Sequence, residues 1–192
     1  MLYNIARALS WFYLKVICGM KTEGRENLPK DGAALICANH IHLLDPAALC
    51  INLNRYVSYL AKKEIFEKRF SRWLFTGLHA IPVERDGTDT AAVMKALRIL
   101  KKGGLLGIFP EGTRERGRGM LEFKSGAAFI SIVSKAPVIP AYIEGRYIPF
   151  GKLRVVFGSP IMPPDIKRPD AEDLKEFTDR LAQTIAGLKE KQ

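Results

Sequence analysis

Short apolar runs alternate with segments of helical period along most of the chain. The strand-like runs cover residues 33–38, 56–61, 80–83, 105–109, 138–143 and 153–157. Amphipathic stretches separate several of these runs from one another. Such alternation of strands and helices is typical of the α/β class, and we therefore predict an α/β fold.

Two later segments have the period of amphipathic helices. The first spans about residues 91–102 and ends at Gly103, and the second follows Asp170, whose side chain can cap its first turn. The positions predicted to face inward are Val93, Leu97 and Leu100 in the first helix, and Leu174, Phe177, Leu181, Ile185 and Leu188 in the second.

Residues 1–20 have the spacing of a helix with one apolar face. The apolar positions are Leu2, Ile5, Ala6, Leu9, Phe12, Tyr13, Val16, Ile17 and Met20. Trp11 and the cationic Arg7 and Lys15 suit a helix that lies in a bilayer interface with its cations toward anionic lipid. A helix packed on a protein core has the same pattern. We therefore divide the chain into an amphipathic membrane-interface helix, residues 1–20, and an α/β domain, residues 21–192, and leave that alternative open.

Length and composition describe one folded domain that meets an anionic partner. The chain has 192 residues, of which 47% are hydrophobic, and 30 Lys and Arg outnumber 20 Asp and Glu to give a net charge of +10. Such a charge suits nucleic acid, anionic lipid, a phosphorylated substrate or an acidic carrier protein. Three cysteines without a CxxC pair favour a reducing, cytoplasmic compartment. We expect neither a secretory signal nor a membrane span, because no apolar stretch reaches about 18 residues.

A polar cluster follows the predicted strand at residues 33–38. Within one helix, His40 and Asp45 would lie roughly 140° apart, so His40 is expected to precede a helix that Asp45 caps and Pro46 begins. A histidine oriented by an aspartate is a general base. Two alternatives remain: a cap and a loop residue without catalytic roles, or a metal site that uses His40 and His42 with Asp45 or His79.

A second cluster suits a phosphate group. Residues 107–114 end a strand in a turn at Gly112, which we expect to expose main-chain N–H groups beside Arg114. The further arginines are Arg85, after the strand at 80–83, and Arg116 and Arg118. The alternative is a solvated basic loop in which Glu111 pairs with a neighbouring arginine.

Four blocks occur in order along the chain: Asn39-His40 with Asp45, Ile81-Pro82-Val83 with Arg85, Phe109 to Arg114, and Val138-Ile139-Pro140. Together they resemble the blocks of the glycerolipid acyltransferases, most of all the bacterial 1-acyl-sn-glycerol-3-phosphate acyltransferases. HX4D alone is a weak signal, but its combination with FPEGTR about 70 residues later is specific. The resemblance implies a mixed central sheet flanked by helices, with the amphipathic helix in front.

The resemblance also implies an activity. An acyl group would move from acyl-CoA or acyl-ACP to the sn-2 hydroxyl of lysophosphatidic acid, giving phosphatidic acid on the cytoplasmic face of the membrane. His40 would be the base and Asp45 its orienting partner, without metal or cofactor. The residues implied to bind the substrate phosphate are Arg85, Glu111, Gly112, Thr113, Arg114 and, less specifically, Lys62.

Two positions depart from the family pattern. His79 stands where members often have glycine, and Glu115 where they have serine. If His79 lies near the phosphate, it either adds a hydrogen-bond donor when protonated or simply fills space. For membrane docking we consider the N-terminal helix and residues 62–73, whose aromatic positions also suit a core-facing stripe.

Two other functions fit the sequence less well. One is an acyltransferase that acts on a different lysolipid acceptor, and the other is a basic non-catalytic lipid- or nucleic-acid-binding protein; we expect no nucleic-acid partner.

Overall fold

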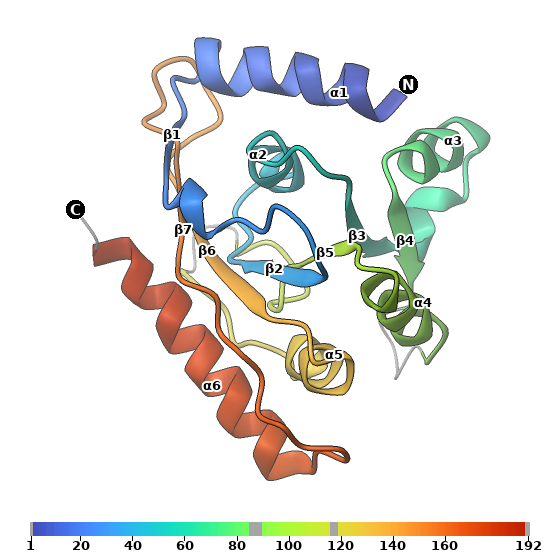
Figure 1. Cartoon of the computed structure of the whole chain (residues 1–192). Coiled ribbons are helices and arrows are strands. Elements are labelled where there is room, and N and C mark those ends of the chain that lie inside the picture. The colour runs from blue at the N-terminus through green and yellow to red at the C-terminus, as the bar shows by residue number, and fades with distance from the viewer. Residues whose placement is uncertain (1, 85–89, 116–118, 191–192) are drawn as a thin grey trace.

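The computed structural model describes residues 2–84, 90–115 and 119–190 (Figure 1). These residues form a seven-stranded sheet in the order β1-β7-β6-β2-β5-β3-β4. Neighbouring strands are parallel except for the antiparallel pair β6 and β7, so the predicted mixed sheet is confirmed. The strands are β1 (Lys21–Glu23), β2 (Ala34–Ala38), β3 (Val57–Lys62), β4 (Ala80–Val83), β5 (Leu105–Ile108), β6 (Val138–Glu144) and β7 (Arg154–Phe157).

Helices cover both faces of this sheet (Figure 1). α1 and α2 lie over one face and α5 and α6 over the other, while α3 and α4 lie at the β4 end. The helices are α1 (Leu2–Trp11), which continues as the π-helix η1 (Phe12–Ile17), α2 (Asp45–Cys50), α3 (Arg69–Gly77), α4 (Thr90–Lys101), α5 (Gly126–Ser134) and α6 (Ala171–Gly187). The short 3-10 turns are η2 (Arg25–Asn27), η3 (Lys63–Phe66) and η4 (Leu188–Glu190).

The central strand β2 divides the core in two. Ala34, Ile36 and Ala38 pack into the cluster beneath α1 and α2, whereas Leu35 and Cys37 pack into the cluster beneath α4, α5 and α6. All five residues are buried because both faces of the sheet are covered. This double burial explains why the strand is a continuous apolar run.

The predicted helix ends are confirmed where side chains or backbone dihedrals define them. Asp170 accepts hydrogen bonds from the N–H groups of Glu172 and Asp173, and the Asp173 carboxylate accepts from the Asp170 N–H in return. α4 ends before Gly103, whose φ of +76° belongs to the left-handed region that glycine adopts readily.

The N-terminal helix packs on the domain with one side and exposes apolar residues on the other. Tyr3 and Leu14 belong to the core. Arg7 donates to the Leu53 carbonyl oxygen (2.7 Å) and Lys15 to Thr22 Oγ1 (2.6 Å), so both cations turn toward the protein, contrary to the orientation expected for them. The outer positions, 49% to 67% exposed, are Ile5, Leu9, Phe12 and Val16. Among the described residues, no helix has the length and hydropathy needed to cross a bilayer.

Candidate active site

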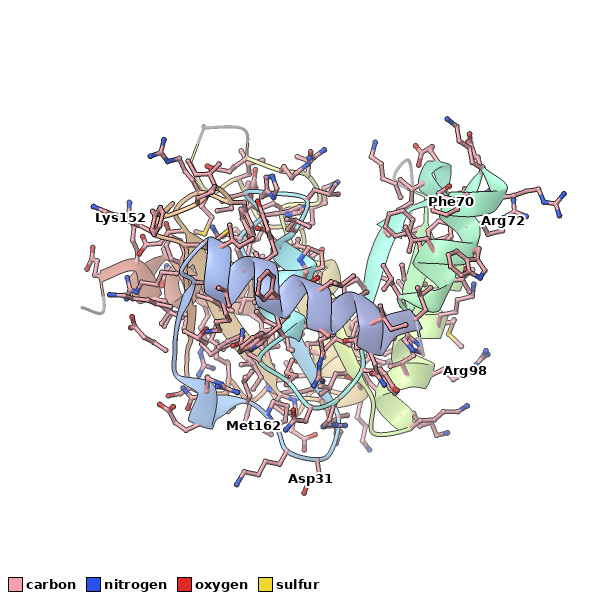
Figure 2. All side chains as sticks on the ribbon, turned by 90° about the horizontal axis from the view of Figure 1, so that it is seen from above. Asp31, Phe70, Arg72, Arg98, Lys152 and Met162 are labelled. Carbon is pink, nitrogen blue, oxygen red and sulfur yellow. The ribbon has the colours of Figure 1, made fainter. Side chains whose placement is uncertain are left out.

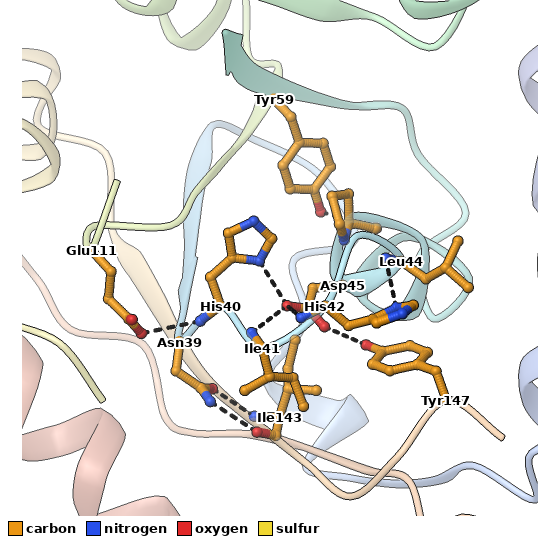
Figure 3. A network of polar contacts seen from close by, with 11 residues as sticks. Asn39, His40, Ile41, His42, Leu44, Asp45, Tyr59, Glu111, Ile143 and Tyr147 are labelled. Atoms are coloured by element: carbon orange, nitrogen blue, oxygen red, sulfur yellow. Dashed lines mark hydrogen bonds and ion pairs between the residues drawn. The ribbon is translucent and has the colours of Figure 1, made fainter. Parts of the chain in front are cut away.

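The site begins where β2 ends. Asn39, directly after the strand, is buried and makes two hydrogen bonds with the main chain of Ile143 on β6, both 2.8 Å (Figure 3). These bonds fix the direction in which the chain leaves the sheet. The next residue, His40, therefore stands at the carboxyl edge of parallel strands, where open α/β sheets place ligands.

His40 and Asp45 are in direct contact. His40 Nδ1 lies 2.7 Å from Asp45 Oδ2, and α2 begins at Asp45, so the expectation that His40 precedes the helix is confirmed. Because an ionised carboxylate only accepts hydrogen bonds, Nδ1 carries the hydrogen and the lone pair is on Nε2. The His40 side chain is 18% exposed and Asp45 is wholly buried. This arrangement leaves Nε2 to accept a proton.

Asp45 differs from the predicted helix cap. Leu44 occupies the cap position, no side chain caps α2, and the Asp45 carboxylate turns back onto the loop that precedes it. Oδ2 accepts from the main-chain N–H groups of Ile41 (2.7 Å) and His42 (2.8 Å) as well as from His40. Charge-assisted bonds to one oxygen outweigh a helix cap here, because they fold the whole loop around the carboxylate.

Tyr147, in the loop between β6 and β7, is a site residue that sequence reasoning missed. Its hydroxyl donates to Asp45 Oδ1 over 2.5 Å (Figure 3), across 102 residues of sequence. Burial, followed by the negative charge of Asp45, raises the pKa of Tyr147 far above its ordinary value, so the hydroxyl keeps its proton. No local pattern around Tyr147 signals this contact.

Aromatic stacking fixes the His40 ring. The ring stacks on Phe109, with centroids 4.2 Å apart, and Phe109 in turn stacks on Tyr59 at 5.9 Å. Gly107 makes room for Tyr59, because a Cβ at that glycine would lie 2.1 Å from the tyrosine ring. Phe109 opens the FPEGTR block, so the block supplies packing to the histidine in addition to its polar residues.

Glu111 contacts His40 in the structure and does not extend toward solvent as a phosphate ligand would. The His40 N–H donates to Glu111 Oε1 over 3.0 Å, and Glu111 is only 4% exposed. Burial raises its pKa, against the lowering effect of the N–H groups of His40 and Leu121. A buried carboxylate would repel a phosphate dianion. In the structure Glu111 holds the His40 main chain, and its predicted contact with the substrate phosphate stays a prediction.

The other residues expected at the phosphate follow neighbouring strands. Thr113 and Arg114 come after β5 and are exposed, and Lys62, also exposed, ends β3 in register with Val83 of β4. The Gly112 N–H, expected to be available to an anion, donates instead to the Phe109 carbonyl oxygen at 2.9 Å. Arg85, Arg116 and Arg118 lie outside the described residues.

His79 lies at the amino end of a strand, whereas His40 lies at the carboxyl end of one. His79 precedes β4, whereas the site lies beyond the carboxyl ends of the strands, and its ring contacts Tyr3 (5.6 Å) and Tyr56 (5.0 Å). The condition for a donor role, a position near the phosphate, is therefore not met, and the His79 ring fills space between two tyrosines. Its φ of +60° belongs to the region that favours glycine, the residue common at the matching family position.

The metal alternative requires at least three ligand side chains that converge on one point. His40 Nδ1 is bonded to Asp45, and His42 Nδ1 accepts from the Leu44 N–H at 3.2 Å. Within the described part of the chain, no three His, Cys, Asp or Glu side chains group as ligands for a metal ion.

Comparison with known proteins agrees with this geometry. A family model described as Acyltransferase matches residues 19–144. The chain belongs to the acyltransferase family. The predicted enzyme class is thereby confirmed, and the matched segment contains His40, Asp45 and the basic residues discussed above.

Individual relatives extend the similarity over the whole chain. A 1-acyl-sn-glycerol-3-phosphate acyltransferase of Bacillus subtilis is 32% identical over 189 residues, which cover 93% of this chain and 94% of that protein. One of Borreliella burgdorferi is 31% identical over 119 residues, 61% of this chain and 48% of that protein. The crystal structure of the acyltransferase PlsC from Thermotoga maritima has the same fold, with a TM-score of 0.74, 23% identity, and coverage of 100% of this chain and 79% of that one.

Proposed function

We propose that this acyltransferase moves a fatty acyl group from a thioester to the sn-2 hydroxyl of 1-acyl-sn-glycerol-3-phosphate, giving phosphatidic acid. The observation that carries the proposal is the 2.7 Å contact between His40 Nδ1 and the buried Asp45, which leaves Nε2 as a base at the ligand edge of the sheet. The printed names of the relatives from Bacillus subtilis and Borreliella burgdorferi support this acceptor.

The chemistry needs no covalent intermediate on the protein. His40 Nε2 takes the proton of the acceptor hydroxyl while the hydroxyl oxygen attacks the thioester carbonyl carbon. Asp45 stabilises the imidazolium that forms. The carbon–sulfur bond then breaks, and the departing thiolate takes the proton from His40. The products are the new ester and a free thiol, on coenzyme A or on acyl carrier protein.

The acceptor phosphate is proposed to lie over the ends of β5, β3 and β4. Parallel strands are about 4.8 Å apart, so Lys62 on β3 begins about two strand spacings from His40 on β2. That separation matches a glycerol phosphate whose hydroxyl lies at His40 and whose charge is met by Lys62 and Arg114. Arg85, which follows Val83 on the next strand, is proposed to join them.

Membrane docking is proposed to use the outer side of the N-terminal helix together with α3. Phe70 and Trp73 on α3 are 72% and 59% exposed, so the core-facing alternative does not apply to them, although Phe66 is buried. Figure 2, in which α1 faces the viewer, shows Phe70 and Arg72 on α3, to one side of the N-terminal end of α1. Phe150 in the β6–β7 loop, 90% exposed, adds an apolar residue not anticipated from sequence. Exposed apolar side chains near lysine and arginine side chains suit binding to an anionic bilayer surface.

The test is phosphatidic acid formation from lysophosphatidic acid, with acyl-CoA and acyl carrier protein thioester as parallel donors. Wild type is expected to react with at least one donor, and His40→Ala is expected to lose the activity while remaining folded. His79→Gly is the matched histidine control, because glycine suits the φ at that position and the residue lies far from the site. Equal activity of His40→Ala and wild type would contradict the mechanism, and turnover of another lysolipid alone would contradict the acceptor.

A further inference from the structure

The β6–β7 loop, residues 145–153, brings one side chain to the buried carboxylate from outside the HX4D motif. Tyr147 OH donates to Asp45 Oδ1, while Oδ2 accepts from His40 and from two main-chain N–H groups. Both oxygens of Asp45 are thus bonded. Among the described residues, Tyr147 and His40 are the two side chains that hydrogen-bond this carboxylate.

We propose that Tyr147 is a positioning residue that holds the Asp45 carboxylate with Oδ2 directed at His40. The N-terminal helical segment in turn holds Tyr147 in position. The contact between this segment and Tyr147 is made by Tyr13 on η1, whose hydroxyl donates to the Tyr147 carbonyl oxygen over 2.9 Å. The Phe150 N–H also donates to the Ile17 carbonyl oxygen (3.4 Å). The inference rests on the proposed function only in taking His40 as the base.

The surroundings of Tyr147 suit a fixed donor. Tyr147 is 8% exposed, and its ring stacks on His42 with centroids 4.3 Å apart. The raised pKa keeps the phenol protonated through the range in which a histidine titrates. The donor and its orientation therefore persist while His40 changes charge.

This arrangement links the proposed lipid surface to the base. Tyr13 lies next to Phe12, which is 54% exposed on the outer side of the helix. From Tyr13 the bonds run through Tyr147 and Asp45 to His40. The position of the N-terminal helical segment and the orientation of His40 thus depend on the same series of hydrogen bonds.

Tyr147→Phe is the first test, because it removes the hydroxyl and keeps the ring. We expect kcat to fall about tenfold, with an unchanged KM for the acceptor, since the lost bond is to a charged group that acts through His40. The acid limb of the pH–rate profile should move to higher pH, because a carboxylate with one donor fewer holds more negative charge and favours the protonated imidazole. The other titratable groups that face the pair, unchanged in this variant, are His42, Tyr59, Glu111 and Cys18.

Tyr13→Phe should shift the profile in the same direction with a smaller loss of kcat, about threefold, because it loosens Tyr147 without removing its donor. Tyr56→Phe is the matched control, since Tyr56 is 53% exposed and packs against Tyr3 and His79. A wild-type kcat and pH profile in Tyr147→Phe would overturn the proposal.

An NMR titration of the His40 ring gives a readout without substrate. The resonances, assigned with His40→Ala, should titrate at higher pH in Tyr147→Phe than in wild type. If wild type acylates no lysolipid, the proposed function fails, and this titration still decides the role of Tyr147. If Tyr147→Phe does not fold, the same titration in Tyr13→Phe decides it, and an unchanged midpoint there refutes the link to the helix.

Discussion

Replacing Leu9 and Phe12 together by glutamine should release the protein from anionic lipid vesicles. Both side chains lie on the outer side of the N-terminal helical segment, where they are 67% and 54% exposed. Neither belongs to the core clusters, so the domain should stay folded. The change therefore tests the lipid contact separately from the fold.

The exposed fractions set the size of the effect. Complete burial of a leucine or phenylalanine side chain contributes about 1.5–3 kcal/mol, so burying in lipid the part that is still exposed contributes about 1–2 kcal/mol for each. Loss of both should weaken partitioning by about 2–4 kcal/mol, or roughly 30- to 900-fold. Arg7 and Lys15 add little to this binding, because both are hydrogen-bonded toward the protein.

Co-sedimentation with vesicles of anionic and zwitterionic phospholipid measures the partition coefficient. Met162→Gln is the matched control: Met162 is 62% exposed, but it lies next to the Ile161–Val138 bridge, at the start of β6 and away from α1. The control should bind as wild type does. An unchanged partition coefficient in the double variant would refute the assignment of this helix face to lipid.

Three further substitutions test the site. Asp45→Asn should lower kcat about 10^3- to 10^4-fold, measured as phosphatidic acid formed, because the neutral amide neither fixes the His40 tautomer nor stabilises the imidazolium. Burial raises the pKa of Glu111 above its usual 4.5, so the folded state binds a proton more tightly than the unfolded state and stability falls as pH rises through the window above 4.5. The Tm of Glu111→Gln relative to wild type should therefore rise between about pH 4 and pH 7 in calorimetry, and a constant difference would contradict this. Asn39→Ala leaves two buried groups of Ile143 unpaired and should cost about 2–4 kcal/mol, a fall in Tm of about 5–15 °C by circular dichroism.

The elements that the sequence predicted are those with a clear hydrophobic period. All six predicted strands occur, as do the helices near 91–102 and after Asp170. β1 was missed because Lys21, Thr22 and Glu23 contain no apolar side chain, and its pairing with β7 depends on a distant strand. α5 was missed because it is apolar on nearly every side, so that no stripe distinguishes it.

Within the site, the motif predicted local contacts and failed at distant ones. His40 and Asp45 meet because only four loop residues, 41–44, separate them ahead of a helix, a geometry available from spacing alone. The hydrogen bond from the His40 N–H to the Glu111 carboxylate was not predicted, since the two residues lie 71 positions apart in the sequence. The contacts of His79 with Tyr3 and Tyr56 were not predicted, because they join segments that only the folded chain brings together.

Hydrophobic period and short motifs are local properties of the chain, and they were enough to predict the fold class, the contact between His40 and Asp45, and the acyltransferase family. Tertiary structure alone decided that Tyr147 donates to Asp45, that Phe109 stacks on His40, and that the cations of the N-terminal helix face inward. These contacts join segments far apart in sequence. Their energy depends on burial and on distances of a few ångströms, which exist only after the sheet has brought those segments together.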